Sequence, residues 1–341
     1  MKVLAIESTC DETAASVVES PSAGSGLSGV KVLSSVVASS AKIHEKYGGV
    51  VPEVASREQV KSIIPVITEA LGETNTKEVD AIAVSFGPGL MGSLLIGVET
   101  AKVLAWVFDK PLLKVNHVSA HLMANWLTEE DNRTPEMPAI GLVASGGHTD
   151  FVYIKSLKDW EWIGGTRDDA AGEAFDKVAR AFGLAYPGGP EIDKEANRVS
   201  DEDYGKLRKE ERLPRPLIND GSLEMSFSGL KAAVTRLDLN ETNKGIYIRD
   251  FAEAVTEVLV KKTKLAMEKY EVKSVLLAGG VAANTKIREA MKKVVEEEGL
   301  KFFVPELKYC GDNAAMIGAS AVLNPQKASY EDSPDPGMSV V

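Results

Sequence analysis

Hydrophobic residues occur along this chain in short runs that are separated by polar turns and by longer amphipathic stretches. Short apolar runs bounded by polar or glycine-rich residues are typical of buried β-strands. We therefore expect strands at 2–7, 14–18, 31–38, 79–86, 111–115, 139–144, 151–154 and 273–278. Apolar residues at helical spacing or in longer runs predict helices over 53–71, 93–106, 119–127 and 285–298. Strands that alternate with helices in this way indicate an α/β fold.

The second half of the chain repeats the order of the first. A strand, a polar turn and a strand surround Ser8–Thr13, and the same order surrounds Ser145–Thr149. A strand, a glycine turn and a helix surround 87–92 and again 279–284. This weak internal duplication predicts two similar α/β lobes.

We place the lobes at 1–133 and 134–324 and expect their turns to face a cleft, where ligands commonly bind. The second lobe carries extra helical material at 167–270, and a helix at 312–323 could pack across onto the first lobe. Residues 325–341 read as a flexible tail, and 20–30 as a flexible hairpin tip or local insertion.

Composition narrows the class of protein only slightly. A chain of 341 residues with 44% hydrophobic and 26% charged residues is typical of a soluble protein of about two domains. It has no membrane-spanning stretch and no signal peptide, which predicts a cytoplasmic protein. Its net charge of −11 argues against a broad, non-specific nucleic-acid surface. The segment Lys206–Arg215, with five basic residues, is a candidate local exception.

The pair His117 and His121 is the first candidate for chemistry. Residues four apart lie on one face of a helix, so both imidazoles can bind one metal ion, although two merely hydrogen-bonded histidines fit the pattern as well. If the lobes fold as expected, Asp312 is the natural third ligand. Two imidazoles and one carboxylate suit Fe(II), Zn(II) or another divalent ion.

Two familiar interpretations fail on position. A zinc protease of the H-E-x-x-H type needs a glutamate after the first histidine, and Val118 occupies that place. Gly87–Gly92 matches G-x-G-x-x-G, but Asp109 precedes the next strand instead of ending it, which argues against dinucleotide binding.

Other polar stretches have less specific meanings. The turns Ser8–Thr13 and Ser145–Thr149 are either ordinary hairpin turns or phosphate-binding turns, and their occurrence at matching positions favours the second interpretation. Four carboxylates lie within Asp168–Lys177, where Glu173 and Asp176 share a helix face, although acids are also common at solvated helix starts.

Ten motifs in the same order carry a resemblance to a known family. They are Ile6–Thr13, His44–Arg57, Gly87–Gly92, His117–His121, Ser145–Thr149, Asp168–Lys177, Tyr186–Pro190, Ser226–Lys231, Ala278–Asn284 and Asp312–Gly318. Together they resemble the tRNA N6-adenosine threonylcarbamoyltransferases of bacterial (TsaD) type, once described as glycoproteases. The resemblance covers about residues 1–323.

The resemblance implies two duplicated RNase H-like lobes facing a cleft, the fold of acetate and sugar kinases, 70-kDa heat-shock chaperones and actin. It implies transfer of a threonylcarbamoyl group from threonylcarbamoyl-AMP to N6 of the adenosine 3′ to the anticodon, in tRNAs that read ANN codons. It also implies a metal ion, usually iron, bound by His117, His121 and Asp312. The implied substrate contacts are Val143, Ala144, Ser145, Gly146, Gly147, Asp176, Gly189, Asp193 and Asn284.

For the proton lost by the amine we expect Asp11 or Glu12 as acceptor, and for the oxyanion or phosphate His148 as donor. The resemblance implies three macromolecular partners: tRNA, a degenerate paralogue of the same fold (TsaB-like) and a small P-loop ATPase (TsaE-like). Two alternatives stay open, a small-molecule kinase of the same fold and a non-catalytic scaffold paralogue. A kinase has no use for the His-His-Asp set, and scaffold copies typically lose the histidines.

Overall fold

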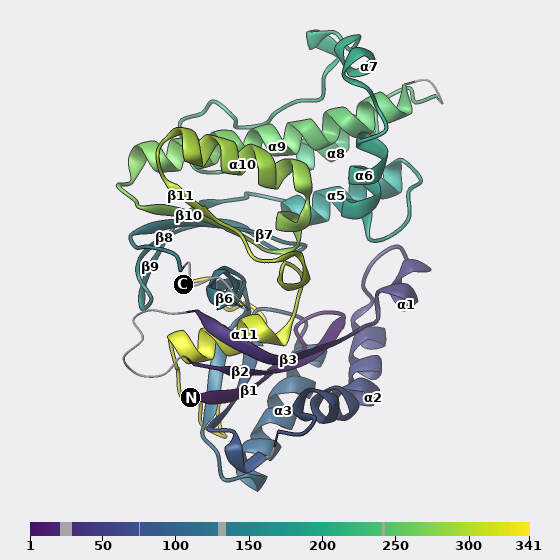
Figure 1. Cartoon of the computed structure of the whole chain (residues 1–341). Coiled ribbons are helices and arrows are strands. Elements are labelled where there is room, and N and C mark those ends of the chain that lie inside the picture. The colour runs from purple at the N-terminus through teal and green to yellow at the C-terminus, as the bar shows by residue number, and fades with distance from the viewer. Residues whose placement is uncertain (21–28, 75, 129–133, 241–242) are drawn as a thin grey trace. The chain divides into compact units, whose positions relative to one another are not determined.

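The computed structural model describes residues 1–20, 29–74, 76–128, 134–240 and 243–341 (Figure 1). The predicted insertion at 20–30 falls mostly on 21–28 and so lies outside the described residues. The chain divides into two compact units. Unit 1 comprises Met1–Glu136, Ser156–Trp160 and Pro305–Val341, and unit 2 comprises Met137–Lys155 and Glu161–Val304. The division differs from the predicted lobes mainly at the C-terminus, since the chain from Pro305 onward belongs to unit 1.

Unit 1 is built on a mixed sheet of six strands in the order β5-β4-β1-β2-β3-β6. Their bounds are β1 Lys2–Glu7, β2 Glu12–Glu19, β3 Val30–Ser39, β4 Ala81–Gly87, β5 Leu112–Asn116 and β6 Leu127–Thr128. β1, β4 and β5 run parallel, whereas β2 pairs antiparallel with both β1 and β3. Parallel pairing brings the carboxyl ends of β1, β4 and β5 to one edge of the sheet, where Glu7, Gly87 and Asn116 end these strands.

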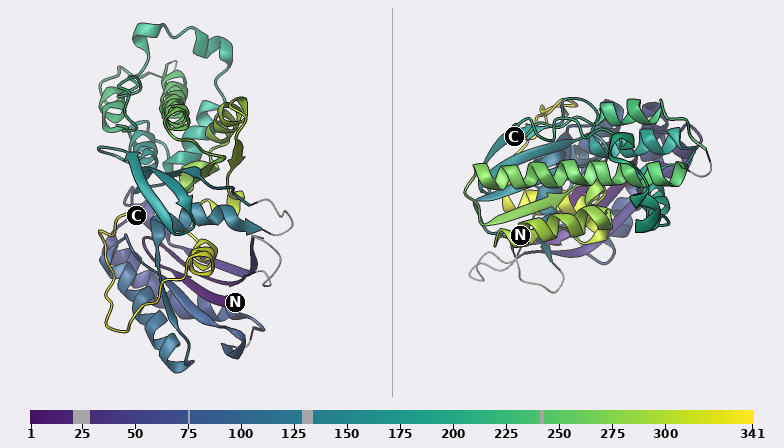
Figure 2. Two further views of the ribbon diagram at one scale, coloured as in Figure 1. Left: turned by 90° about the vertical axis from the view of Figure 1, so that its left-hand side faces the viewer. Right: turned by 90° about the horizontal axis from the view of Figure 1, so that it is seen from above.

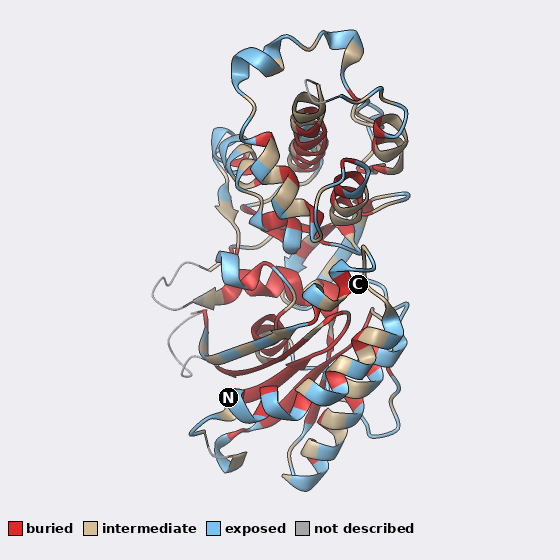
Figure 3. Ribbon diagram, turned by 90° about the vertical axis from the view of Figure 1, so that its right-hand side faces the viewer, coloured by how far each residue is buried: buried red, intermediate tan, exposed pale blue. Residues whose placement is uncertain are grey.

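Helices cover both faces of this sheet (Figure 1). The helices α2 (Pro52–Leu71) and α3 (Met91–Val107) share a buried core with Leu4 and Ile6 of β1. On the opposite face lies α11 (Ala314–Leu323), whose Gly318 contacts Ala5 of β1 and Val18 of β2. Side chains alternate between the two faces of a strand, so β1 packs against α2 and α3 on one face and against α11 on the other. Figure 3 shows the result, with buried strands and helices that expose their outer sides.

Unit 2 repeats this design. Its sheet has the order β11-β10-β7-β8-β9, with β7 antiparallel to β8 and parallel to β10. The bounds are β7 Ala139–Ala144, β8 Thr149–Ser156, β9 Asp159–Gly165, β10 Ser274–Ala278 and β11 Lys301–Phe303. The order matches β5-β4-β1-β2-β3 strand for strand, which confirms the predicted duplication and the α/β class.

The helices of unit 2 lie mostly between β9 and β10, in the region predicted as extra helical material. They are α5 Ala171–Ala181, α6 Gly188–Ala196, α7 Asp201–Gly205, α8 Ser228–Val234 and α9 Lys244–Lys269, followed after β10 by α10 Thr285–Glu297. Within the described parts of the chain, none of the helices combines the length and the hydrophobicity needed to cross a membrane.

The segment 325–341, which we expected to be a flexible tail, runs along unit 1 (Figure 2). It has no helix or regular strand, but its backbone is anchored. The Ala328 amide donates to the Leu112 carbonyl at 2.9 Å, and the Asp335 amide donates to the Phe86 carbonyl at 2.8 Å. Met338 packs against the core of unit 1. The lack of sequence periodicity therefore reflects an irregular strap, held by carbonyl groups of β4 and β5.

Candidate functional site

The two histidines of the predicted metal pair lie one turn apart on α4 (His117–Met123), which begins directly after β5. Asn116 caps this helix, because its Oδ1 accepts a hydrogen bond from the Ser119 amide at 3.0 Å. The cap starts the helix at His117, so both imidazoles point to the same side. Their ring centres are 4.8 Å apart, and both side chains are buried.

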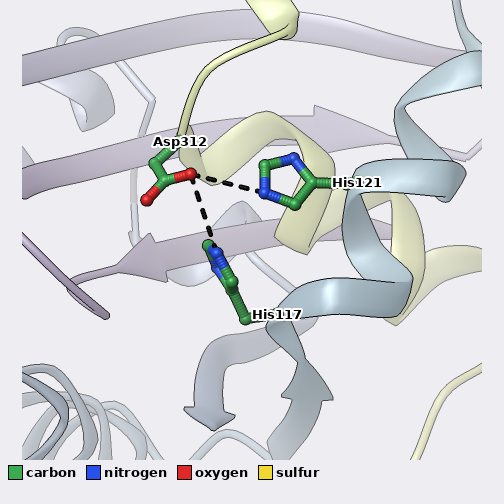
Figure 4. A group of neighbouring side chains, drawn as sticks. All are labelled: His117, His121 and Asp312. Carbon is green, nitrogen blue, oxygen red and sulfur yellow. Dashed lines mark ion pairs between the residues drawn. The ribbon is translucent and has the colours of Figure 1, made fainter. Parts of the chain in front are cut away.

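Asp312 completes the group from the far end of the chain (Figure 4). Its Oδ1 lies 3.6 Å from Nε2 of His117 and 3.4 Å from Nε2 of His121. It directly precedes Asn313, whose Oδ1 caps α11 by accepting from the Met316 amide at 3.0 Å. The three ligand atoms lie within 4.8 Å of one another, and all three residues belong to unit 1.

These side chains fit a divalent cation. Neither ring nitrogen of His121 makes a hydrogen bond with the described residues, although Nε2 approaches Asp312. A buried imidazole without a hydrogen bond costs free energy, which a bound cation would remove at Nε2. Two imidazole nitrogens and a carboxylate oxygen form a donor set that leaves positions open for a substrate.

Glu7 and Thr9 contact Nδ1 of His117, the ring nitrogen that does not face Asp312. Its Nδ1 lies 3.0 Å from Oε2 of Glu7 and 3.2 Å from Oγ1 of Thr9. Burial opposes protonation of this imidazole, but the negative charges of Glu7 and Asp312 outweigh it and raise the pKa of His117 to about 9. A cation that binds Nε2 of His117 must displace the proton that this nitrogen carries when the imidazole is protonated.

The turn Ser8–Thr13, which carries Asp11 and Glu12, lies in the same unit. Burial, followed by the charges of Asp312 and Asp11, raises the pKa of Glu12 to about 9. Burial, followed by the charge of Asp11, also raises the pKa of the Cys10 thiol well above its usual range. In the metal-free protein Glu12 therefore holds a proton at neutral pH, and it can accept one only after a cation has lowered its pKa.

Residues that the sequence did not single out hold this turn in place. The Gln59 side-chain amide donates to the carbonyl groups of Ser8, Cys10 and Glu12 at 3.2, 3.0 and 3.0 Å. Ser93 Oγ donates to the Cys10 carbonyl at 3.0 Å. Gln59 and Ser93 sit inside helical patterns, where nothing distinguishes them from other polar positions.

Glu7 was also missed as a functional residue, although a signal for it existed. It is the last residue of an otherwise apolar strand and is fully buried. Acids are almost never fully buried unless they are paired, so an acid at the carboxyl end of a core strand indicates a partner.

The predicted substrate residues lie in unit 2. The turn after β7 is tightly tied, since the Ser145 amide donates to the His148 carbonyl at 2.8 Å and the Gly172 amide donates to the Ser145 carbonyl at 3.0 Å. Val143 and Ala144 are fully buried, so only their backbone groups can reach a ligand. A Cβ added at Gly146 or Gly147 would meet no atom within 4 Å, which leaves open space beside this turn.

The remaining substrate residues form a second group around α6. Asp176 Oδ1 accepts from the Gly188 amide at 2.7 Å, and Asn284 Nδ2 donates to Asp193 Oδ1 at 3.1 Å. Partial burial raises the pKa of Asp193. A Cβ at Gly189 would also meet open space. The structure thus pairs Asp193 with Asn284, which are distant in sequence, and leaves accessible backbone at Gly189.

The acids at the start of the Asp168–Lys177 motif have structural partners. Partial burial opposes ionisation of Asp168, but hydrogen bonds from Ser226 and Ser228 lower its pKa to about 2. Asp169 and Glu173 form ion pairs with Lys177 at 2.7 and 2.8 Å. These contacts join the Asp168–Lys177 and Ser226–Lys231 motifs and explain Asp168, Asp169 and Glu173 without a ligand.

The basic segment Lys206–Arg215 is largely neutralised by its own neighbours. Lys206 pairs with Asp203 at 2.6 Å, Arg208 pairs with Glu211 at 2.5 Å, and Arg215 pairs with Asp250 at 2.9 Å. Most of its positive charge therefore has a protein partner already.

Comparison with known proteins identifies the family. The family model described as "TsaD: tRNA N6-adenosine threonylcarbamoyltransferase" matches residues 31–319. A tRNA N6-adenosine threonylcarbamoyltransferase of Persephonella marina is 47% identical over 327 residues, 93% of this chain and 88% of the relative. The enzyme of that name from Bacillus subtilis is 45% identical over 350 residues, 99% of this chain and 95% of the relative.

Solved structures show the same fold at low sequence identity. Component A of the (R)-2-hydroxyglutaryl-CoA dehydratase of Acidaminococcus fermentans aligns with a TM-score of 0.53 and 13% identity, over 95% of this chain and 97% of that chain. The activator of the 2-hydroxyisocaproyl-CoA dehydratase of Clostridium difficile, solved with bound ADPNP, gives 0.52 and 12%, over 95% and 93%. With its family model matched over most of its length and relatives near half identity, this chain belongs to the tRNA N6-adenosine threonylcarbamoyltransferase family.

Proposed function

We propose that this protein transfers the threonylcarbamoyl group from threonylcarbamoyl-AMP to N6 of the adenosine 3′ to the anticodon, in tRNAs that read ANN codons. Family membership over nearly the whole chain supports the reaction. The observation that carries the mechanism is the convergence of His117, His121 and Asp312 on one point.

We assign these three residues to one divalent ion and propose Fe(II), with Zn(II) as the other ion that this donor set accepts. A bound cation supplies Lewis-acid stabilisation for the negative charge that develops on the carbamoyl oxygen. The protein supplies the rest: α4 carries both histidines, Asp312 lies just before α11, and Glu7 contacts Nδ1 of His117.

The substrate is a mixed anhydride of a carbamic acid and a phosphate, so it is already activated. The adenosine N6 attacks the carbamoyl carbon, the bond from that carbon to the phosphate oxygen breaks, and AMP leaves. The attacking amine is weakly nucleophilic because its lone pair is delocalised, so positioning matters more than base strength. Asp11 and Glu12 are our candidates to accept the amine proton; the pKa of Glu12 is raised to about 9 in the metal-free protein, so Glu12 could take this role only with the cation bound. We assign to His148 donation toward the oxyanion or the phosphate.

For the adenylate we propose the accessible backbone of Gly146, Gly147 and Gly189 and the side chains of Asp176, Asp193 and Asn284. The open space at all three glycines supports close approach of a ligand to the backbone. The hydrogen bond between Asp193 and Asn284 places both polar groups together, where Asp193 can accept from a ribose hydroxyl.

A protein partner is supported by exposed apolar side chains on α2 and α3, which pack side by side with Gly92 against Ser56. These side chains are Val60, Ile64, Met91, Leu95, Val103, Trp106 and Val107. Apolar patches of this kind mark interaction surfaces. We propose a degenerate paralogue of the same fold as the partner for this face, and a small P-loop ATPase as a further member of the assembly. The net charge of −11 also favours tRNA binding with partners over binding by this chain alone.

The test is incubation of the purified protein, its partners and a divalent metal with threonylcarbamoyl-AMP and unmodified tRNA. The proposal predicts a threonylcarbamoyl adduct at the adenosine beside the anticodon. Phosphorylation of a small acceptor by ATP, with no tRNA adduct, would instead identify a kinase of this fold.

A further inference from the structure

Glu7 has both carboxylate oxygens engaged in the interior of unit 1. Oε1 accepts a hydrogen bond from the Thr9 amide at 2.6 Å, and Oε2 lies 3.0 Å from Nδ1 of His117. The side chain is fully buried. A buried carboxylate with one partner on each oxygen holds both partners in fixed positions.

The contact with His117 decides which ring nitrogen carries the proton. An ionised carboxylate only accepts hydrogen bonds, so Nδ1 of a neutral His117 must be the N–H nitrogen. Nε2 then presents its lone pair on the side where Asp312 lies, 3.6 Å away. His121 makes no comparable hydrogen bond with the described residues, so the contact with Glu7 sets the tautomer of His117 and not that of His121.

The contact with Thr9 ties the same carboxylate to the turn that leads to Asp11 and Glu12. The Thr9 carbonyl accepts from the Leu90 amide at 2.8 Å, and Gly89 packs so closely on Thr9 that an added Cβ would lie 2.6 Å from that carbonyl oxygen. Through Glu7, the position of this turn and the orientation of His117 depend on each other.

We propose that Glu7 is a positioning residue, which fixes the Nδ1–H tautomer of His117 for metal binding through Nε2 and couples that ligand to the turn carrying Asp11 and Glu12. The inference rests on the proposed metal-dependent function. A carboxylate behind a ligating histidine commonly changes metal affinity by about 10- to 100-fold when it is removed.

Glu7→Gln is the most informative variant because it keeps the size and shape of the side chain. The Thr9 amide and His117 Nδ1 lie at different oxygens of Glu7, and an amide replaces one of these oxygens with an NH₂ group that cannot accept. If its oxygen keeps the Thr9 amide, its NH₂ group faces Nδ1 and forces the proton of neutral His117 onto Nε2. We expect zinc and Fe(II) to bind about 10- to 100-fold more weakly than in the wild type. Glu78→Gln, an exposed partner of Lys2 in the same unit, is the matched control and should bind metal as the wild type does.

Two measurements separate positioning from a general structural role. Metal titration of a Glu7→Gln protein that keeps the wild-type secondary structure should show the roughly 10- to 100-fold weaker metal binding. Wild-type metal affinity in this variant would overturn the proposal. Nitrogen-15 spectra of the metal-free wild type, at alkaline pH where His117 is neutral, should show the proton on Nδ1. A proton on Nε2 would overturn the proposal even if Glu7→Gln fails to fold. A wild type that binds no metal but shows the Nδ1–H tautomer would contradict the metal-dependent function and leave the tautomer assignment standing.

Discussion

The packing of α11 on the sheet of unit 1 makes Gly318→Ala a strong test of how Asp312 is held. An ideal Cβ at Gly318 would lie 2.5 and 2.9 Å from the two methyl carbons of Val18 and 3.3 Å from the Cβ of Ala5. Carbon atoms normally approach to about 3.5–4.0 Å. An alanine here therefore requires α11 to move away from the sheet by about 1 Å, or Val18 to leave its position in a buried core.

The expected cost follows from that displacement. Overpacking of a well-packed core typically destabilises a protein by about 1–3 kcal/mol, and we expect this loss for Gly318→Ala. Asp312 lies just before the first turn of α11, so it moves with the helix relative to His117 and His121 on α4. Metal–ligand distances tolerate only about 0.2 Å. A shift several times larger should weaken metal binding by at least about 10-fold, in line with lesser changes around such sites.

The assay is urea unfolding of the metal-free protein together with competition for zinc against a chelator. Gly311→Ala is the matched control, because it lies next to Asp312 but its added Cβ would meet no atom within 4 Å. It should keep both stability and affinity. If Gly318→Ala is destabilised while its zinc affinity stays at the wild-type level, α11 does not set the position of Asp312. Unchanged stability would refute the packing argument itself.

Three further predictions concern pH, the substrate turn and the C-terminal strap. The pKa of His117 rises from 6.5 to about 9 on folding and that of Glu12 from 4.5 to about 9, so between pH 6.5 and 9 the folded metal-free protein binds more protons than the unfolded chain. Its unfolding free energy should therefore fall as pH rises through this window, by up to about 1.4 kcal/mol per pH unit from each group. In denaturant titrations Glu12→Gln should reduce this slope, and an unfolding free energy that rises with pH would contradict both pKa shifts. Gly147→Ala should change the unfolding free energy by less than about 0.5 kcal/mol. It should raise KM for threonylcarbamoyl-AMP by about 10-fold or more, because the added methyl group enters the open space beside the turn. An unchanged KM would exclude a close approach of the substrate to Gly147. Deletion of 325–341 should lower the unfolding free energy of unit 1 by about 2–4 kcal/mol, because backbone hydrogen bonds are lost and the core surface that Met338 covers becomes exposed. Ser339→Ala keeps the carbonyl that accepts from Asn116 and should leave the unfolding free energy unchanged. Equal melting curves for the deletion variant and the full chain would contradict this anchoring.

The sequence predicted the elements well where a local pattern determines them. Strand 139–144 was predicted with the bounds that β7 has, and the helix at 53–71 begins one residue earlier as α2. Both segments are bounded by turn residues; the first is a continuous apolar run, and the second has apolar residues at helical spacing. The duplication was also readable, because equivalent strands and turns recur in the same order.

Long-range placement was harder to predict. We expected a helix at 312–323 to pack onto the first lobe, but no local pattern indicated that the whole chain from Pro305 onward belongs to unit 1. The strap at 325–341 is held largely through its own backbone groups, which leave no side-chain signature within that segment. Of the site, the histidine pair followed from helical spacing, whereas the partners that orient it, Glu7 and Thr9, depend on the meeting of β1 with α4.

The most direct test of the central account compares the wild type with His117→Ala in one assay. Each protein is incubated with Fe(II) and its partners, and its bound metal is measured. It is then given unmodified tRNA and threonylcarbamoyl-AMP that carries labelled threonine, and the tRNA is digested and analysed by mass spectrometry. The account predicts labelled threonylcarbamoyladenosine with the wild type, and loss of both bound metal and product with His117→Ala. Full product formation by a His117→Ala protein that holds no metal would contradict it.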